Sequence, residues 1–289
     1  MTRVPLPLLV LALVAGCTTP TATPRERLGS LGVPYSSAAF VAQAGEGDIE
    51  AVRLFLDAGM PVDVRDGDGV TALTNAAAGG FVDVVNALLA RGASVQPRNV
   101  RGLTPLTAAA WAGHADVVDT LLAHGADPNS VDGTGQNALM LAVRSQHPSV
   151  VNALLNKGAP AWFQDDHWSA LMLAAFLGDG ETVKALVAHH ANVEAADDRG
   201  MTALMYAASQ GDADVVKTLV AAGAKVEARD VAGHTALMFA ANNGRMDAVM
   251  ALKDAGADVY ARNRNGKNAA AYALTNGHTD IAAVLDRES

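Results

Sequence analysis

The sequence has a single cysteine, Cys17, among its 289 residues. One cysteine excludes an internal disulfide, a CxxC redox pair and a cysteine-based zinc site. Positive charge is also scarce, because 21 Lys and Arg stand against 30 Asp and Glu, a formal net charge of -9. Nucleic-acid binding needs clustered Lys and Arg, so we expect no nucleic-acid partner. The charges form no run of one sign, which excludes an acidic tail.

Aromatic residues are few, at 4% of a chain that is 50% hydrophobic. Small side chains, mainly alanine, must therefore fill the spaces between its helices. The sequence also has no HExxH, GxSxG or P-loop motif. We therefore expect no metal centre, no cofactor and no catalytic residues.

No apolar run is long enough to cross a membrane. The run from Val4 to Ala15 follows one basic residue, Arg3. It falls short of the roughly 20 apolar residues of a transmembrane helix and suits a secretory signal. Residues 14–17 (Val-Ala-Gly-Cys) resemble the lipobox of bacterial lipoproteins.

The lipobox resemblance implies a signal peptide over residues 1–17 that ends at a lipidated Cys17. Several acyl chains on one residue give stable membrane anchoring. Thr18 follows, and by the same resemblance the absence of Asp there favours the outer membrane of a Gram-negative cell, on its periplasmic face. Plain secretion with cleavage near Gly16 remains the alternative. Residues 18–30 are polar and Pro-rich, so we predict a flexible tether over 18–35.

An internal repeat dominates the remaining sequence. The octapeptide ending at Leu73 (DGDGVTAL) recurs in related form up to Leu106 and Leu139, in steps of 33 residues. Leu171, Leu204 and Leu237 continue the series at the same spacing, after one step of 32. Each octapeptide precedes an Ala-rich segment, a Gly, a Val/Leu-rich segment and a Gly-Ala turn. The pattern over residues 36–288 resembles the ankyrin repeat, with its TPLHxAAxxGH, IVxxLL and GADxN signatures.

The physical chemistry of the repeat agrees with this resemblance. The Thr before each Ala-rich segment suits a helix N-cap, and Gly after the second segment suits a left-handed C-cap. One unit cannot bury its apolar face alone, so the units must stack. We predict an all-α ankyrin-repeat solenoid over residues 36–289, with about eight helix-turn-helix units joined by β-hairpin-like turns. The units lie near 36–65, 66–98, 99–131, 132–163, 164–196, 197–229, 230–262 and 263–289.

Two features depart from the family. The histidine slot of TPLH holds Met140, Met172, Met205 and Met238 in the middle units. Flexible apolar side chains suit core filling, although a metal-binding or oxidant-sensing stripe is the alternative. A metal site at His189 and His190 is disfavoured, because adjacent residues on a helix do not face one ligand.

The unit that begins at Gln164 is irregular. His167 takes a hairpin Gly slot, His190 replaces the Gly that ends the outer helix, and we place the missing residue between Gly158 and Gln164. A break in a regular array marks either function or tolerated drift.

By the ankyrin resemblance, a partner binds to the hairpin tips and the inner-helix face that line a concave groove. All three tryptophans fall at or beside these slots, and Trp is enriched among residues that dominate binding energy. An alternative is that Trp162 and Phe163 fill the gap left by the missing residue. The predicted partner-binding residues are Trp111, Arg144, Trp162, Phe163, Asp165, Asp166, Trp168, Phe176, Leu177, Asp198 and Arg199.

The sequence thus predicts a monomeric, lipid-anchored, exported scaffold that binds a protein partner. One alternative is an inhibitor or immunity-type protein that masks an exported enzyme. An enzyme is a third class, but it needs polar groups that converge in a closed pocket, which an open solenoid seldom provides.

Overall fold

A computed structural model describes residues 22–165 and 167–286, which form seventeen α-helices and no extended strand. After α1 (Pro24–Ser30), the helices alternate between an inner and an outer row. The inner row is α2 (Ser37–Glu46), α4 (Ala72–Gly79), α6 (Pro105–Ala112), α8 (Ala138–Arg144), α10 (Ala170–Leu177), α12 (Ala203–Gln210), α14 (Ala236–Asn242) and α16 (Ala269–Thr275). The outer row is α3 (Ile49–Asp57), α5 (Val82–Ala90), α7 (Ala115–Ala123), α9 (Pro148–Asn156), α11 (Gly180–Ala188), α13 (Ala213–Ala221), α15 (Met246–Asp254) and α17 (Thr279–Asp286).

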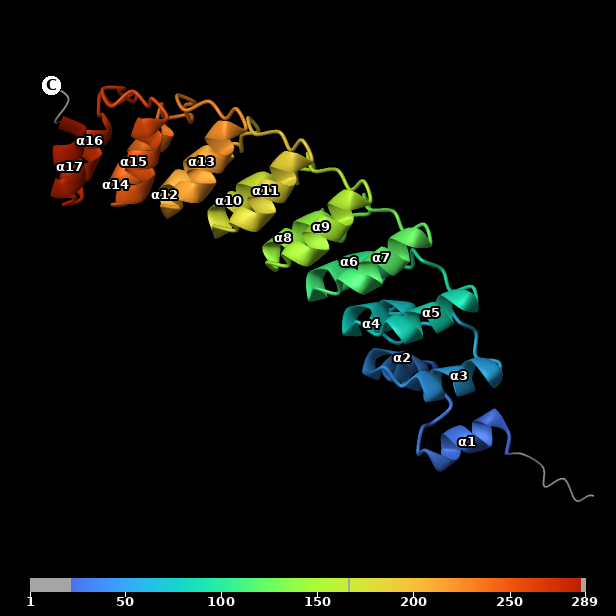
Figure 1. The fold of residues 1–289 in the computed structure, drawn as a ribbon. Coiled ribbons are helices and arrows are strands. Elements are labelled where there is room, and N and C mark those ends of the chain that lie inside the picture. The colour runs from blue at the N-terminus through green and yellow to red at the C-terminus, as the bar shows by residue number, and fades with distance from the viewer. Residues whose placement is uncertain (1–21, 166, 287–289) are drawn as a thin grey trace, which may run out of the picture.

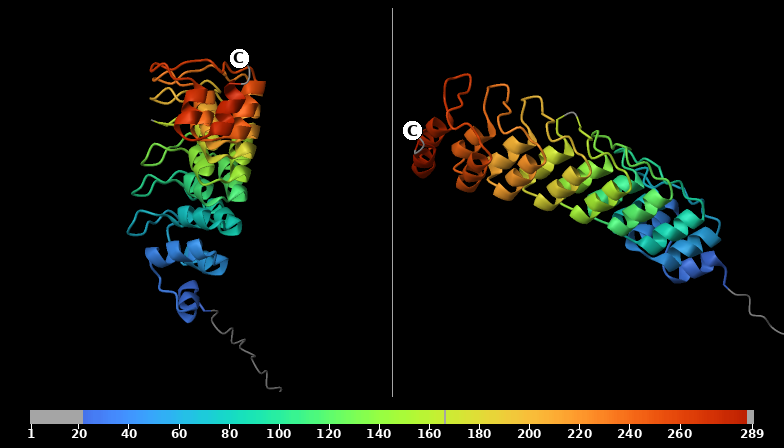
Figure 2. Two further views of the ribbon diagram at one scale, coloured as in Figure 1. Left: turned by 90° about the vertical axis from the view of Figure 1, so that its left-hand side faces the viewer. Right: turned by 45° about the horizontal axis from the view of Figure 1, so that its top comes forward.

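The eight helix pairs stack side by side into a curved array (Figure 1). Each inner helix packs on the inner helix of the next unit, and neighbouring outer helices pack in the same way. The connecting loops project together to one side of the helices (Figure 2, left). Four of these loops close with an isolated antiparallel bridge, such as Arg65 with Thr71 and Val131 with Asn137. The predicted solenoid of eight units is confirmed.

The inner helices begin where the sequence predicts. Thr71, Thr104 and Thr202 each accept a hydrogen bond from the backbone N–H three residues later. Asn137 and Ser169 do the same for α8 and α10. These caps satisfy N–H groups that have no partner inside the helix.

The core is one continuous layer between the two rows. Pairs such as Ala109 and Ala110 are fully buried and allow neighbouring inner helices to approach closely. Met140 and Met172 are also fully buried, which supports core filling rather than a surface stripe. No group of three His, Cys, Asp or Glu side chains among the described residues is arranged to hold a metal ion. None of the helices described is long and apolar enough to span a bilayer.

The predicted tether over 18–35 was wrong for its second half. Residues 24–30 form α1, which packs on α3. Thr23 and Glu26 form a capping box, and Leu28 is fully buried in the core. Arg27 also forms an ion pair with Glu50 of α3, at 2.8 Å. One apolar residue and a good cap dock this short helix, although the segment has no apolar periodicity. Cys17 and the rest of residues 1–21 lie outside the described residues.

The missing residue also lies elsewhere than predicted. Gln164 lies six positions after Gly158, just as Val131 lies six positions after Gly125, so this segment has the ordinary length. The bridge of the irregular hairpin joins Gln164 to Ser169, five residues apart, whereas the other bridges span six. The deletion is therefore in the hairpin tip, beside Asp165.

Within residues 22–165 and 167–286, two residues other than glycine have a left-handed backbone. His190 has a φ of 62°, as its place at the end of α11 predicts. Gln146 has a φ of 56° and takes the position of Gly113 and Gly178 after the inner helix, a departure that the sequence analysis missed. Both residues border the irregular part of the array.

Candidate protein-binding groove

Three aromatic rings from neighbouring units meet beside the irregular hairpin. Trp168 follows the hairpin tip, Phe176 lies on α10 and Tyr206 lies on α12. The Trp168 ring stacks on Tyr206, with 4.4 Å between centroids, and meets the Phe176 ring edge-on at 5.3 Å. Phe176 and Tyr206 also pack edge-to-face, at 6.0 Å. Such pairs add stabilisation beyond simple area burial, so the three rings form a rigid cluster.

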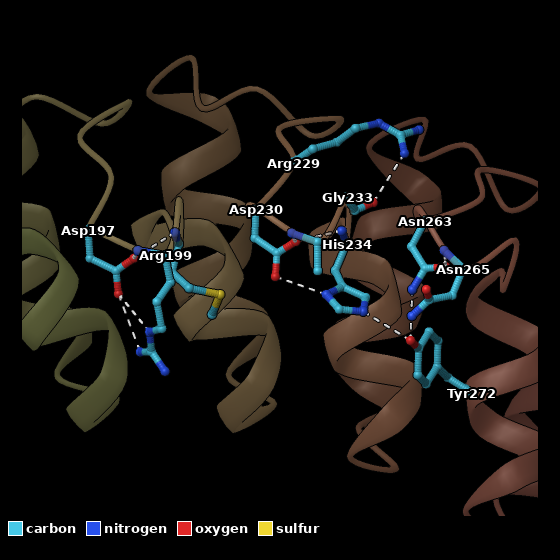
Figure 3. A network of polar contacts seen from close by, with 11 residues as sticks. Asp197, Arg199, Arg229, Asp230, Gly233, His234, Asn263, Asn265 and Tyr272 are labelled. Atoms are coloured by element: carbon cyan, nitrogen blue, oxygen red, sulfur yellow. Dashed lines mark hydrogen bonds and ion pairs between the residues drawn. The ribbon is translucent and has the colours of Figure 1, made fainter.

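The hydroxyl of Tyr206 connects this cluster to the next hairpin. It donates to Asp197 Oδ2 at 2.6 Å and accepts from Arg199 Nη2 at 2.7 Å. Arg199 also bonds to Asp197, at 3.3 Å (Figure 3). Burial, followed by the hydrogen bond to Asp197 and the charge of Asp197, raises the pKa of Tyr206 to about 12.

Asp165 fixes the shortened hairpin. Its Oδ1 accepts from the N–H groups of His167 and Trp168, at 2.9 and 2.7 Å, and its Oδ2 accepts from Gln136 Nε2 at 3.2 Å. Burial raises the pKa of Asp165. These hydrogen bonds and the positive charge of Arg144 outweigh that effect, so the pKa lies below its ordinary value. Asp165 is therefore ionised at neutral pH.

Two cavities flank Trp168. The larger is about 540 Å³ and is bounded by the hairpins of two units and the end of α8. Its lining residues are Thr134, Gln136, Arg144, Asp165, His167 and Trp168. The smaller is about 300 Å³ and is lined by His167, Trp168, Asp197, Asp198 and Arg199. We call these two cavities and the inner-helix ends beside them the central groove.

Trp111, Arg144 and Phe176 occupy one position in three consecutive inner helices. Each lies five residues after the repeat leucine of its unit (Leu106, Leu139 or Leu171), in the last turn of α6, α8 or α10. Trp111 is 60% exposed, Phe176 is 42% exposed, and Arg144 is exposed as well. The stack therefore places an aromatic ring, a cation and a second aromatic ring in sequence along the inner row. We call these three residues the central stripe.

The remaining predicted residues are more scattered. Trp162 is 69% exposed on the loop before the hairpin, so it does not fill a gap. Phe163 and Leu177 are half-buried and pack against the core. Asp198 is exposed at the next hairpin, and Asp166 lies outside the described residues. The structure thus gathers Arg144, Asp165, Trp168, Phe176, Asp198 and Arg199 near the groove and leaves Trp162 and Phe163 on the connecting loop.

A second polar network lies one unit beyond the network of Asp197, Arg199 and Tyr206. His234 bonds through Nδ1 to Asp230 Oδ2 and through Nε2 to Tyr272 Oη, each at 2.9 Å (Figure 3). Asn263 donates to the same Tyr272 oxygen at 2.8 Å. These bonds connect the hairpins of neighbouring units to α16.

Sequence reasoning missed both Tyr206 and Tyr272. Tyr206, Phe239 and Tyr272 follow one another at intervals of 33 residues, so they share one inner-helix position. Three aromatic residues in register were the available signal that this position contacts the hairpin.

The comparisons with known proteins agree with this architecture. The sequence matches the family described as "Ankyrin repeats (3 copies)" over residues 38–132, 97–165, 139–230 and 224–287. The chain belongs to the ankyrin-repeat family. Ankyrin-repeat domains are general scaffolds for protein–protein interaction. The comparison with curated protein sequences found no match.

Two solved ankyrin structures illustrate the likeness. The ankyrin repeat domain of human ASB11 has a TM-score of 0.68 and 28% identity, covering 75% of this chain and 98% of its own. The ankyrin repeat domain of Bcl-3, from the IκB family, has a TM-score of 0.65 and 29% identity, covering 75% and 99%.

Proposed function

We propose that this ankyrin-repeat protein is a monomeric, exported scaffold that binds a protein partner in the central groove. The observation that carries the proposal is the exposure of large side chains at the central stripe. Trp111 and Phe176 leave much of their apolar surface in water, and Arg144 between them lines a cavity of about 540 Å³. Clustered exposed aromatic surface on a soluble array indicates an interaction site.

Electrostatics around the groove favours specific recognition over simple adhesion. Asp165 and Arg199 are held by hydrogen bonds in fixed positions, so a partner meets a charge pattern that is already ordered. Preorganised groups lower the entropy cost of binding. The cavities are open and lie between loops, which suits the docking of a partner's side chains.

Site-specific photo-cross-linking tests where the partner docks. A photoreactive phenylalanine analogue replaces Phe176 in the full chain, and the cross-linked products from intact cells are identified by mass spectrometry. The control carries the analogue at Met250, which is 41% exposed on the outer helix α15. We expect one dominant adduct at Phe176 that is absent at Met250 and is reduced by Trp111→Ala. Equal adducts at both positions would contradict a groove-specific partner.

Export and lipid anchoring are a separate part of the proposal. The support is the sequence of residues 3–17, with one basic residue, an apolar run and the cysteine of a lipobox. Metabolic labelling with a palmitate analogue should mark the wild type and not Cys17→Ser, and the variant should leave the membrane fraction. Labelling of neither protein, with both recovered as secreted products, would favour ordinary signal cleavage.

The same cross-link distinguishes scaffold from inhibitor. If the adduct is an exported enzyme whose activity the purified protein blocks at a one-to-one ratio, the role is masking of that enzyme. If the partner's activity is unchanged, the role is recruitment or restraint. The described residues contain no group of three His, Cys, Asp or Glu side chains arranged to hold a metal ion, and the cavities beside Trp168 are open to solvent.

A further inference from the structure

The groove contains one arginine whose guanidinium is open to solvent, although its charge acts on Asp165 in the same cavity. Arg144 is exposed at the end of α8 and makes no hydrogen bond or ion pair with any described residue. Arg199, in the next cavity, is held by Asp197 and Tyr206. Among the groove's charged residues that the structure describes, Arg144 is thus the cation available to a partner.

The carboxylate that lines the same cavity as Arg144 is already engaged. Asp165 accepts two backbone N–H bonds at Oδ1 and the Gln136 amide at Oδ2. A basic partner side chain would have to compete with these bonds and would also meet the charge of Arg144. An acidic side chain would find the Arg144 guanidinium open and would lose no existing bond. Charge complementarity therefore favours an acid.

The two neighbours of Arg144 specify what surrounds that acid. Trp111 and Phe176 occupy the equivalent positions one unit before and one unit after, and both expose large apolar surface. Resting on the proposed function, we propose that the partner presents a peptide segment with one acidic side chain between two large apolar ones. The acid pairs with Arg144, and the apolar side chains pack on Trp111 and Phe176.

The repeat spacing sets the spacing in the peptide. Packed helices lie about 8–10 Å apart. A peptide in the polyproline II conformation advances about 3.1 Å per residue with three residues per turn, so anchors roughly three residues apart lie on one face of it. The expected pattern is apolar-x-x-acidic-x-x-apolar.

Selection from a displayed library of random 16-residue peptides tests this inference. The bait is the full chain, and the comparison bait is Arg144→Glu. The control bait is Arg53→Glu, which makes the same charge change on the outer helix α3. Arg144 and Arg53 are exposed, so all three baits should have similar melting temperatures, which thermal melts will check.

Wild type and Arg53→Glu should enrich Asp or Glu between two large apolar residues. Arg144→Glu should lose that enrichment, and its affinity for a selected synthetic peptide should fall tenfold or more. The contrary result is a set of selected peptides that require Trp111 and Phe176 but carry a basic or uncharged residue between their apolar residues. That result would overturn this inference and still support the proposed groove. Selected peptides whose affinity is unchanged by both Trp111→Ala and Phe176→Ala would contradict the proposed groove, and this inference with it.

Discussion

The Trp168 ring lies against the Tyr206 ring across the boundary between two repeats, with 4.4 Å between ring centroids. The two residues are 38 positions apart in the sequence, and only the stacking of units brings them together. One face of the indole is thereby covered, while other parts of the ring line both cavities of the central groove. Trp168 differs in this respect from Trp111 and Trp162, which are 60% and 69% exposed.

This difference predicts two classes of tryptophan fluorescence. The wild type should emit at long wavelength and be readily quenched by acrylamide, because two of its three indoles are exposed. Replacing Trp111 and Trp162 with Phe leaves Trp168 alone, and its emission should shift to the blue and resist the quencher. Blue, protected emission from the wild type would contradict the exposure of Trp111 and Trp162.

The left-handed backbone of His190 predicts a stabilising substitution. A side chain at a φ of 62° costs roughly 1 kcal/mol relative to Gly. His190→Gly should therefore raise the free energy of unfolding by up to about 1 kcal/mol, measured by urea denaturation. The matched control is His189→Gly, one residue earlier at a φ of -96°. This substitution relieves no left-handed strain and only adds freedom to the unfolded chain, so it should not raise the free energy of unfolding. Equal effects of the two substitutions would show that backbone strain at His190 is negligible.

The sequence predicted the array well because the repeat itself encodes it. A capping residue such as Thr104, a turn glycine such as Gly113 and a buried pair such as Ala109 and Ala110 recur at fixed spacing, and each acts locally. Contacts between units were harder to predict. Tyr206 reaches Trp168 and Asp197 through stacking, and no local rule places these residues together.

Two predictions were wrong because the sequence pattern does not show contacts made in the folded array. The polar, Pro-rich composition of residues 18–30 predicts no structure for 18–35, yet the buried Leu28 and the ion pair of Arg27 with Glu50 dock α1 on α3. The deletion in the irregular unit was placed in the wrong segment, because counting between leucines cannot say which loop is shorter. Only the bridge from Gln164 to Ser169 locates it.

The burial of Tyr206, together with its hydrogen bond to Asp197, predicts a pH dependence. The folded-state pKa of about 12 exceeds the usual tyrosine value near 10, so the folded protein holds this proton more tightly. The resulting stabilisation is fully present below pH 10 and is lost as the pH rises toward 12. Subtracting the ultraviolet titration curve of Tyr206→Phe from that of the wild type isolates the ionisation of Tyr206, which should have a midpoint near 12. Asp197→Asn should lower that midpoint, and an unchanged value would mean that burial alone causes the shift.

Arginine side chains join several hairpins to the next unit by hydrogen bonds, but the middle hairpins have no arginine at the equivalent position. Arg65 Nη1 donates to the carbonyl oxygens of Gly69 in its own hairpin and Arg98 in the next, at 2.9 and 2.6 Å. Arg229 does the same with Gly233 and Arg262, at 3.1 and 2.7 Å. The equivalent positions in the middle of the array are Val131, Gln164 and Ala196, which carry no guanidinium.

Ala196→Arg should therefore add a bond that this part of the array lacks. The new side chain would reach the carbonyls of Gly200 and Arg229, which occupy the places of Gly69 and Arg98. A net hydrogen bond is worth about 0.5–1.5 kcal/mol, and solvent exposure places this one at the lower end. Urea denaturation should show a gain for Ala196→Arg and a loss of similar size for Arg229→Ala. A loss at Arg229 without a gain at Ala196 would mean that the middle hairpins are too far apart, or too mobile, to be joined.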